Sequence, residues 1–344
     1  MNVYRYLKIA ASGLLPARVK LLGLWGLYAT RRRMIGVFLD PVLACNLRCK
    51  MCYMSDPEGR APVRGQTLTD ADIERIARAF YGRALKLQIG CATEPTLYGR
   101  LPELIADARR RGVPYISLTS NGKLIAAGKV DLNRMADAGL DELTLSMHGT
   151  TREVYEELMP GARFDELQRL TQIIADVKRR HPAFSVRVNF TVNSLNLHDL
   201  EGDRFWSLWA DGGLPDIIQL RPVQRLGNTA WTDFDLTPLK QHYDTTIGAI
   251  AARAKELGIS CIAPTRDQID EVATDQDGTS TIVSDMTYCY ISPETTYKDD
   301  FLPTDTYDSY HRRRSTGRRL FGAIFGRNAA SKPKGSKHLN YHVR

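Results

Sequence analysis

Short runs of aliphatic and β-branched residues alternate with longer amphipathic stretches through most of this 344-residue chain. Such alternation predicts repeated β/α units, because neighbouring parallel strands must be joined by a crossover that is usually a helix. The run Ile217–Leu220 is almost wholly apolar, as expected for a strand buried on both faces. The sequence therefore predicts an α/β fold with a parallel sheet. The predicted strands are Gly36–Leu39, Leu85–Ile89, Tyr115–Thr119, Glu142–Ser146, Ser185–Val192 and Asp216–Arg221.

The amphipathic stretches between these runs supply the predicted helices. Thr69, followed by Asp72 three residues later, is a typical N-terminal cap for the first of them. A helix over Leu239–Leu257 leads to a late strand near Ile259–Ala263. Parallel β/α folds place their chemistry at the carboxyl ends of the strands. The remaining predicted helices are Asp70–Tyr81, Leu101–Arg111, Leu132–Ala138, Phe164–Arg180 and Asp199–Ala210.

Three cysteines, Cys45, Cys49 and Cys52, lie close together directly after the first predicted strand. This C-x3-C-x2-C spacing allows three thiolates on one loop to bind three irons of a [4Fe–4S] cube. Cubes that only carry electrons normally have four cysteine ligands. Three ligands would leave one iron open to a small molecule.

Other uses of clustered cysteines fit this spacing less well. Structural zinc prefers four ligands in paired steps, and the nearby Cys91 is alone, so we expect it to be a small packing residue. A disulfide scaffold is typical of small secreted chains. Unreactive cysteines that are close by chance remain the least favoured alternative.

Composition permits a large buried core. The chain has a mass of 38.7 kDa and 43% apolar residues, enough for one large α/β core or two modest ones. No signal peptide is evident, and the apolar stretch Leu21–Ala29 is too short to span a bilayer. We therefore expect a cytoplasmic protein whose cysteines are reduced.

The net charge of +8 is unevenly distributed. Residues 1–34 hold seven Lys and Arg residues and no acid, and residues 312–344 hold ten and no acid. The intervening residues carry 30 basic and 39 acidic side chains, so two cationic arms flank an acidic body. Such arms favour an anionic partner, either phospholipid headgroups or nucleic acid.

Apolar residues are interleaved with the charge of both arms, as at Leu22 and Trp25 in the first and Phe321 and Phe325 in the last. This pattern is typical of segments that lie on a membrane surface, where each Lys or Arg adds roughly 1 kcal/mol. The alternatives are a core-packing helix with a loosely ordered tail, or nucleic acid, for which no recognised module is present. We favour peripheral contact with the inner face of a membrane.

These observations divide the chain into four parts. A basic amphipathic segment covers residues 1–34, and the α/β core covers residues 35–230. An α/β extension over residues 231–311, with a polar loop at 274–280, is expected to cover the core. The basic tail covers residues 312–344 and is expected to be loosely ordered.

Five further motifs follow the cysteine loop, each at or near the end of a predicted strand. With that loop, their order resembles the radical S-adenosylmethionine (radical SAM) superfamily between about Val37 and Asn228, although the Asn-Gly pair is equally consistent with a simple turn. The resemblance implies a partial (β/α)6 TIM-like barrel of parallel strands with N- and C-terminal extensions. The motifs are Ala92–Pro95, Ser117–Gly122, Leu145–Gly149, Val188–Val192 followed by Asn196, and Gln219–Pro222 followed by Gly227 and Asn228.

The resemblance also implies the ligands of the cofactors. Cys45, Cys49 and Cys52 would bind a [4Fe–4S] cluster whose fourth iron is chelated by the amino and carboxylate groups of SAM. Met51 replaces a usual aromatic residue, and His148 replaces a usual Asp; we expect His148 to be structural rather than an acid or base. The residues implied in SAM binding are Thr93, Glu94, Pro95, Ser120, Asn121, Ser146, Arg187, Asn189 and Arg221.

The activity implied by the resemblance is reductive cleavage of SAM. A flavodoxin- or ferredoxin-type reductant would supply one electron, and the resulting 5′-deoxyadenosyl radical would abstract hydrogen from a substrate. Only Cys261 and Cys289 follow the core, so we expect a single cluster. Cys289 is either a buried structural residue or a hydrogen donor to a substrate radical.

Three functional hypotheses follow. The first is a radical SAM enzyme that acts at a membrane on a lipid, a lipid-linked glycan or a peptide. The second is a soluble enzyme that modifies peptides or small molecules, for example an epimerase that uses Cys289. The third is a nucleic-acid-binding protein stapled by a metal, in which the arms follow the phosphates.

Overall fold

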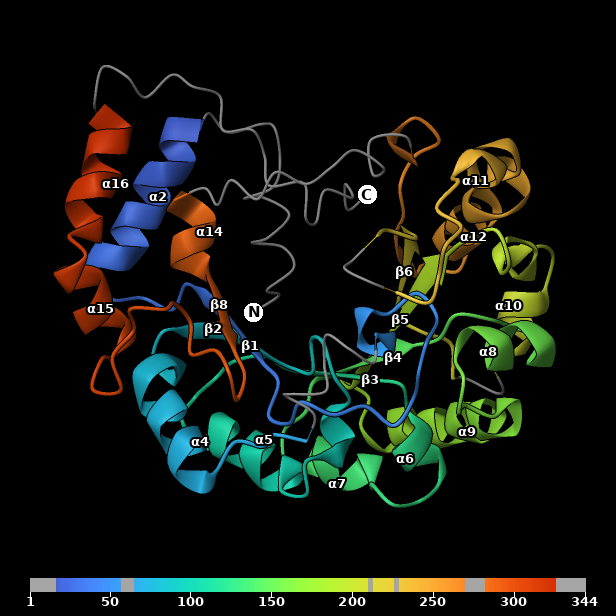
Figure 1. Ribbon diagram of the computed structural model, residues 1–344, viewed down its shortest axis with the longest axis horizontal. Coiled ribbons are helices and arrows are strands. Elements are labelled where there is room, and N and C mark those ends of the chain that lie inside the picture. Colours follow the sequence, from blue (N-terminus) through green and yellow to red (C-terminus); the bar gives the residue numbers. More distant parts are fainter. Residues whose placement is uncertain (1–16, 57–64, 210–212, 226–228, 270–281, 326–344) are drawn as a thin grey trace.

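The computed structural model describes residues 17–56, 65–209, 213–225, 229–269 and 282–325. Its strands form one parallel sheet in the order β7-β6-β5-β4-β3-β2-β1-β8. The sheet is strongly curved and its two edge strands do not pair, so it is an open, partial barrel (Figure 1), as predicted. The strands are β1 Ile35–Leu39, β2 Ala84–Ile89, β3 Ile116–Ser120, β4 Glu142–Ser146, β5 Ser185–Val192, β6 Ile217–Pro222, β7 Ser260–Ile262 and β8 Tyr288–Ile291.

Helices line the convex face of this sheet (Figure 1). The predicted cap of the first is confirmed, since the Thr69 hydroxyl accepts a hydrogen bond from the Asp72 N–H and the Asp72 carboxylate accepts one from the Thr69 N–H. That helix ends in a π-helical turn, Ala77–Tyr81. The helices of this layer and the loops beyond it are α4 Asp70–Ile76, α5 Leu101–Arg110, α6 Lys123–Ala126, α7 Leu132–Asp137, α8 Arg152–Leu158, α9 Phe164–Arg180, α10 Arg204–Ser207, α11 Thr237–Gln241 and α12 Ile247–Glu256.

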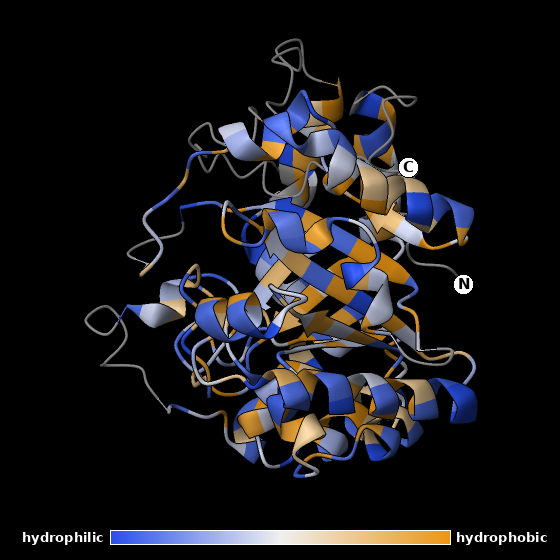
Figure 2. Cartoon of the chain, turned by 90° about the vertical axis from the view of Figure 1, so that its right-hand side faces the viewer, coloured by the Kyte–Doolittle hydropathy of each residue, from blue (hydrophilic) through white to orange (hydrophobic). Residues whose placement is uncertain are grey.

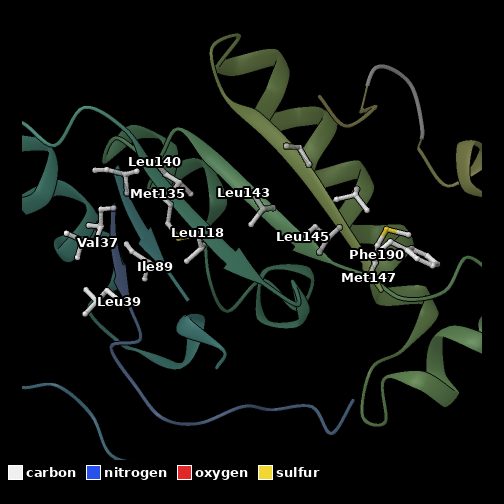
Figure 3. Close-up of a cluster of buried hydrophobic side chains, with 14 of the residues drawn as sticks. Val37, Leu39, Ile89, Leu118, Met135, Leu140, Leu143, Leu145, Met147 and Phe190 are labelled. Carbon is white, nitrogen blue, oxygen red and sulfur yellow. The ribbon is translucent and has the colours of Figure 1, made fainter. Parts of the chain in front are cut away.

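The two faces of the sheet differ in chemistry because side chains alternate along each strand. Hydrophobic and hydrophilic residues alternate visibly along the strands in Figure 2. The hydrophobic set packs against the helices, as the contact of sheet residues with Met135 of α7 illustrates (Figure 3). The opposite, inner face therefore carries the polar set. Its members include Lys86, Gln88, Ser117, Thr119, Glu142, Thr144, Ser146, Arg187, Asn189, Thr191, Gln219 and Arg221.

The extension over residues 231–311 adds a strand at each edge of the sheet. Strand β7, beside β6, is the late strand predicted near Ile259–Ala263, whereas β8, beside β1, was not predicted. The sequence of β8, Tyr-Cys-Tyr-Ile, is too short to be recognised without its neighbour. The loop at 274–280, together with Gly227 and Asn228, lies outside the described residues.

The two basic arms meet in space, which the sequence did not predict. Helix α2, Ala17–Ala29, lies beside α16, Thr316–Phe325, near α14, Ile282–Thr287, and α15, Tyr307–Arg313 (Figure 1). Leu24, Leu320 and Ile324 are buried in this region. The expectation of a loosely ordered tail is therefore wrong for residues 316–325, and residues 326–344 lie outside the described part.

Candidate functional site

The three clustered cysteines lie on the loop that leaves the carboxyl end of β1. None of the three forms a disulfide, and all three are half-buried. Backbone N–H groups already point at two of them, with Leu47 N 3.5 Å from Cys45 Sγ and Met54 N 3.3 Å from Cys52 Sγ. Donors of this kind stabilise negative charge on sulfur. The loop is therefore arranged for thiolates.

The protein around these thiols opposes their ionisation unless a cation is bound. Burial raises the pKa of Cys45 to about 11 and raises that of Cys49 further, and the neighbouring thiols add to both shifts. A bound metal ion deprotonates a coordinating thiol outright. No three His, Cys, Asp or Glu side chains of the described residues are arranged to bind one single ion. A cluster makes a different demand, because each thiolate binds its own iron.

Asp40, directly after β1, anchors the base of the cysteine loop. Its buried carboxylate accepts hydrogen bonds from the Cys91 N–H at 2.8 Å and from the hydroxyl of Tyr290 in β8 at 2.8 Å, and also from the Ala92 N–H. The carboxylate thus joins β1, the end of β2 and β8. Sequence reasoning missed Asp40, although an acidic residue at the carboxyl end of a strand was a signal available for it.

Gly90 makes the sharp turn between β2 and the segment that Asp40 holds. Its φ is +81°, and a Cβ at this position would lie 2.5 Å from the carbonyl oxygen of Thr119. Only glycine tolerates this combination of conformation and close approach. The turn brings Thr93 to the cysteine loop, where its hydroxyl donates to the Val42 carbonyl at 2.6 Å.

Glu94 joins the end of β2 to the end of β3. Its carboxylate accepts hydrogen bonds from the hydroxyl of Ser120 at 2.7 Å, from the Asn121 N–H at 2.8 Å and from the Thr96 N–H at 3.1 Å. Pro95, also buried, begins the short 3-10 helix that follows. Burial raises the pKa of Glu94, whereas these hydrogen bonds act to lower it. The carboxylate is therefore held in a fixed position.

Asn121 extends this network to the cysteines. Its side-chain amide donates to Asn46 Oδ1 at 2.8 Å and lies 4.0 Å from Cys45 Sγ. Thr93, Glu94, Pro95, Ser120 and Asn121 are thus brought together beside the cysteine loop, as the sequence predicted. Most of their polar atoms bond to one another, so they form the frame of the site.

Ser146 and Asn189 face each other on neighbouring strands of the inner face. They are register partners in β4 and β5, and Asn189 in turn pairs with Gln219 of β6. The buried Oδ1 of Asn189 has no hydrogen-bond partner among the described residues. An orphaned buried acceptor of this kind fits a bound ligand with N–H or O–H donors. Arg221 lies one inward-facing position further along β6.

The donor set therefore fits the two predicted cofactors. Three thiols, two of them with N–H support, match an iron–sulfur cluster, and the inner-face row offers the unsatisfied Oδ1 of Asn189 to SAM. The cysteine loop and these strand residues lie toward the same carboxyl edge of the parallel sheet, so one ligand can contact both.

Arg187 does not fit its predicted role. Its guanidinium forms a bidentate ion pair with Glu142, with Nε and Nη2 each 3.1 Å from a carboxylate oxygen. Glu142 is the first residue of β4, at the end of the strand opposite to the cysteine loop. The pairing directs Arg187 away from the cluster ligands, so its expected contact with the SAM carboxylate is not supported.

Cys289 lies on the wrong face of the sheet for a hydrogen donor. It is the register partner of Val37 and is fully buried, so its side chain packs on the hydrophobic, helix-covered side. Substrate at the inner face cannot meet this thiol without disruption of the core. The structural alternative is the one that its position favours.

Two other sequence expectations have opposite outcomes. His148 is buried, and its Nδ1 accepts a hydrogen bond from the Thr191 N–H at 3.0 Å. Burial lowers the pKa of His148 to about 4, so the ring is neutral and structural, as predicted. Cys91, in contrast, is an exposed residue and does not belong to the hydrophobic core.

Comparison with known proteins agrees with this geometry. Residues 40–202 match the Radical SAM superfamily. A probable GTP 3′,8-cyclase of Metallosphaera sedula is 33% identical over 187 residues, covering 52% of this chain and 53% of that protein. Its counterpart in Saccharolobus solfataricus is 30% identical over 197 residues, covering 56% and 58%. The chain thus spans about half the length of the curated relatives it matches.

Solved structures share the fold. Streptococcus suis SuiB bound to S-adenosylmethionine has a TM-score of 0.56 at 13% identity, covering 89% of this chain and 72% of that one. The hydrogenase maturase HydG of Carboxydothermus hydrogenoformans has a TM-score of 0.50 at 13% identity, covering 91% and 73%. Residues 40–202 thus belong to the Radical SAM superfamily, whose members use a [4Fe–4S] cluster and SAM, and the solved structures share the fold of the open parallel barrel.

Proposed function

We propose that this enzyme cleaves SAM reductively and uses the product radical to remove hydrogen from a substrate on the inner face of the sheet. The observation that carries the proposal is the position of three half-buried thiols beside the frame around Glu94. When bound, the cluster and SAM supply a one-electron cleavage that yields methionine and a 5′-deoxyadenosyl radical.

The residues of the chain would act by position rather than by acid–base chemistry. Cys45, Cys49 and Cys52 would hold the cluster at the mouth of the barrel. Glu94 would present a fixed carboxylate to the ammonium group of SAM. Ser146 and Asn189 would orient the rest of SAM from neighbouring strands. Holding reactants in this way converts a bimolecular encounter into an intramolecular one.

Anaerobic reconstitution with iron and sulfide tests the proposal. With SAM and dithionite, the loaded protein should bind about four irons per chain and release 5′-deoxyadenosine. A flavodoxin- or ferredoxin-type protein should replace dithionite as the reductant. Fully loaded protein that releases no 5′-deoxyadenosine would contradict the proposal.

The substrate remains open between two classes within this proposal. Names of relatives point to small molecules and peptides: the curated relatives are called GTP cyclases, and SuiB has been solved with its precursor peptide SuiA. A soluble peptide- or small-molecule-modifying enzyme is therefore the alternative to a membrane enzyme. Superfamily membership gives no support to a metal-stapled nucleic-acid-binding protein.

The surface of the α2–α16 pair favours work at a membrane. Leu22, Phe321 and Phe325 are 47%, 52% and 62% exposed, and the two phenylalanine rings lie 4.6 Å apart. Trp25 and the guanidinium-bearing Arg318 are exposed in the same helices. Exposed large apolar side chains beside cations suit insertion into an anionic leaflet. No helix of the described residues is long and apolar enough to cross a membrane.

The membrane proposal names an anionic lipid surface as partner, and a lipid, lipid-linked glycan or membrane-bound peptide as substrate. It gains from the tertiary structure, because two arms that are distant in sequence contribute to one pair of helices. The basic residues of both arms would then contribute to binding at one surface, at roughly 1 kcal/mol for each Lys or Arg near the leaflet.

Flotation with vesicles measures this contact. We expect the protein to float with phosphatidylglycerol vesicles at low salt and to stay at the bottom with phosphatidylcholine alone. Phe321→Ser combined with Trp25→Ser should reduce flotation at least about tenfold, since each substitution removes apolar burial of up to roughly 1.5–3 kcal/mol. Leu257→Ser is the matched control, because Leu257 is also exposed but follows α12 on the other side of the molecule (Figure 1). Equal recovery of all three proteins would contradict the membrane proposal.

A further inference from the structure

Lys86 of β2 is a cation on the inner face of the sheet. Its register partner in β1 is Gly36, which has no side chain, and Gly36 in turn pairs with Tyr288 of β8. Lys86 is half-buried, and its ammonium lies 5.7 Å from the ring centre of Tyr115. The surrounding protein lowers the pKa of Lys86 by desolvation. The ammonium is therefore surrounded by protein but still open toward the concave side.

The nearby carboxylate of Glu142 is already occupied. It accepts two hydrogen bonds from Arg187, at 3.1 Å each, one from the Tyr115 hydroxyl at 2.8 Å and one from the Thr144 hydroxyl at 3.1 Å. Its charge is matched by the guanidinium.

Lys86 therefore has no hydrogen-bonded anionic partner among the described residues. No hydrogen bond or ion pair joins its Nζ to any of them, although the attraction of Glu142 acts to raise its pKa against the desolvation. One positive charge on this part of the inner face is thus uncompensated. Buried charges are normally paired, because burial of an isolated ion is costly.

The neighbouring side chains are also those of a binding surface. The buried hydroxyl of Ser117, an inward-facing residue of β3, has no hydrogen-bond partner among the described residues. On the other side, Tyr288 is 46% exposed and stacks on Phe38 with 4.4 Å between ring centres. A cation, an unsatisfied hydroxyl and an aromatic surface on one concave wall are typical of a small-molecule site.

We propose that Lys86 receives an anionic oxygen group of the substrate, either a phosphate or a carboxylate. This inference rests on the proposed function, since it describes the substrate of the same site. Ser117 would donate a further hydrogen bond to the anion, and the Phe38–Tyr288 stack would support the adjoining part of the substrate. Both enzyme alternatives above accommodate such a group.

The unfolding temperature of reconstituted enzyme with SAM present tests this role. Sodium phosphate and sodium acetate are added separately at constant ionic strength, and the two salts distinguish the two sources of anionic oxygen. At an anion concentration of ten times Kd, we expect a rise of about 2–4 °C for the anion that fits. Lys86→Met should abolish the rise, and Lys86→Arg should keep part of it.

The control variant is Lys129→Met, which removes an exposed lysine of the loop after α6 and should respond like the wild type. In anion-free buffer, Lys86→Met should unfold at the same temperature as the wild type or higher, because it removes an unpaired, desolvated charge. A lower temperature would mean that Lys86 has a structural partner and would overturn the inference. So would a Lys86→Met protein that responds to both anions as the wild type does, or a wild type that responds to neither.

Release of 5′-deoxyadenosine by the wild type, measured on the same preparation, separates the two proposals. Its absence would count against the proposed function. A failed anion response in protein that does cleave SAM would count against Lys86 alone.

Discussion

Replacement of Cys49 by serine is expected to abolish cluster binding and, with it, the release of 5′-deoxyadenosine. Cys49 is the middle thiol of the loop, and burial raises its pKa more than that of Cys45. A serine hydroxyl at this depth does not ionise and is a poor ligand for iron. Loss of a group that only supports a metal ligand lowers metal affinity or activity about 10–100-fold. Loss of the ligand itself should therefore lower the release of 5′-deoxyadenosine at least about 100-fold. Iron content and 5′-deoxyadenosine are measured after anaerobic reconstitution.

The matched control is Cys261→Ser. Cys261 lies in β7 and pairs with Ile218, whose side chain belongs to the helix-covered face. Its thiol is therefore not part of the candidate site. Its replacement should leave iron content and SAM cleavage within about twofold of the wild type, as expected for a substitution outside the site. Normal iron content in Cys49→Ser would remove the basis of the whole assignment.

Glu94→Gln is expected to weaken SAM binding and to destabilise the protein at the same time. The carboxylate accepts from Ser120, Asn121 and Thr96, whereas a glutamine turns one acceptor into an NH2 donor that must face one of these N–H or O–H groups. Loss of a satisfied buried bond costs about 1–3 kcal/mol. The free energy of unfolding should fall by that amount in urea titrations.

The effect on SAM should be separate from the effect on folding. Loss of the fixed negative charge removes a charge-assisted contact with an ammonium group, which is worth about twice a neutral hydrogen bond. We expect SAM affinity to fall at least about tenfold at temperatures where the variant is fully folded. Glu153→Gln, which changes an exposed carboxylate in the first turn of α8, is the control for both measurements. Unchanged affinity in Glu94→Gln would exclude Glu94 as a SAM ligand.

Local patterns of the sequence were sufficient for most of the core. Strand β5 and helix α9 have the predicted limits, because the hydrophobic period of a long segment indicates whether it is a strand or a helix. The cysteine loop was equally predictable, since its three cysteines lie within one short segment. The frame around Glu94 was predicted in its members but not in its bonding, which joins the ends of two strands.

Roles that depend on which way a side chain points were not predictable. Arg187 and Asn189 alternate on the same face of β5, but only the position of Glu142 in the neighbouring strand shows that Arg187 is engaged elsewhere. The role of Cys289 could not be chosen from the sequence, because the sequence does not show that this residue pairs with Val37. A shift of one residue in register places a side chain on the opposite face.

The sequence by itself determined the β/α architecture, the grouping of three cysteines on one loop and the charge of the two arms, because each depends on spacing or composition within a continuous segment. The tertiary structure alone decided that α2 and α16 lie together, that Asp40 joins three strands, and that no described residue forms an ion pair with Lys86. These facts depend on contacts between segments far apart in the chain, where burial and register, rather than local propensity, set the outcome.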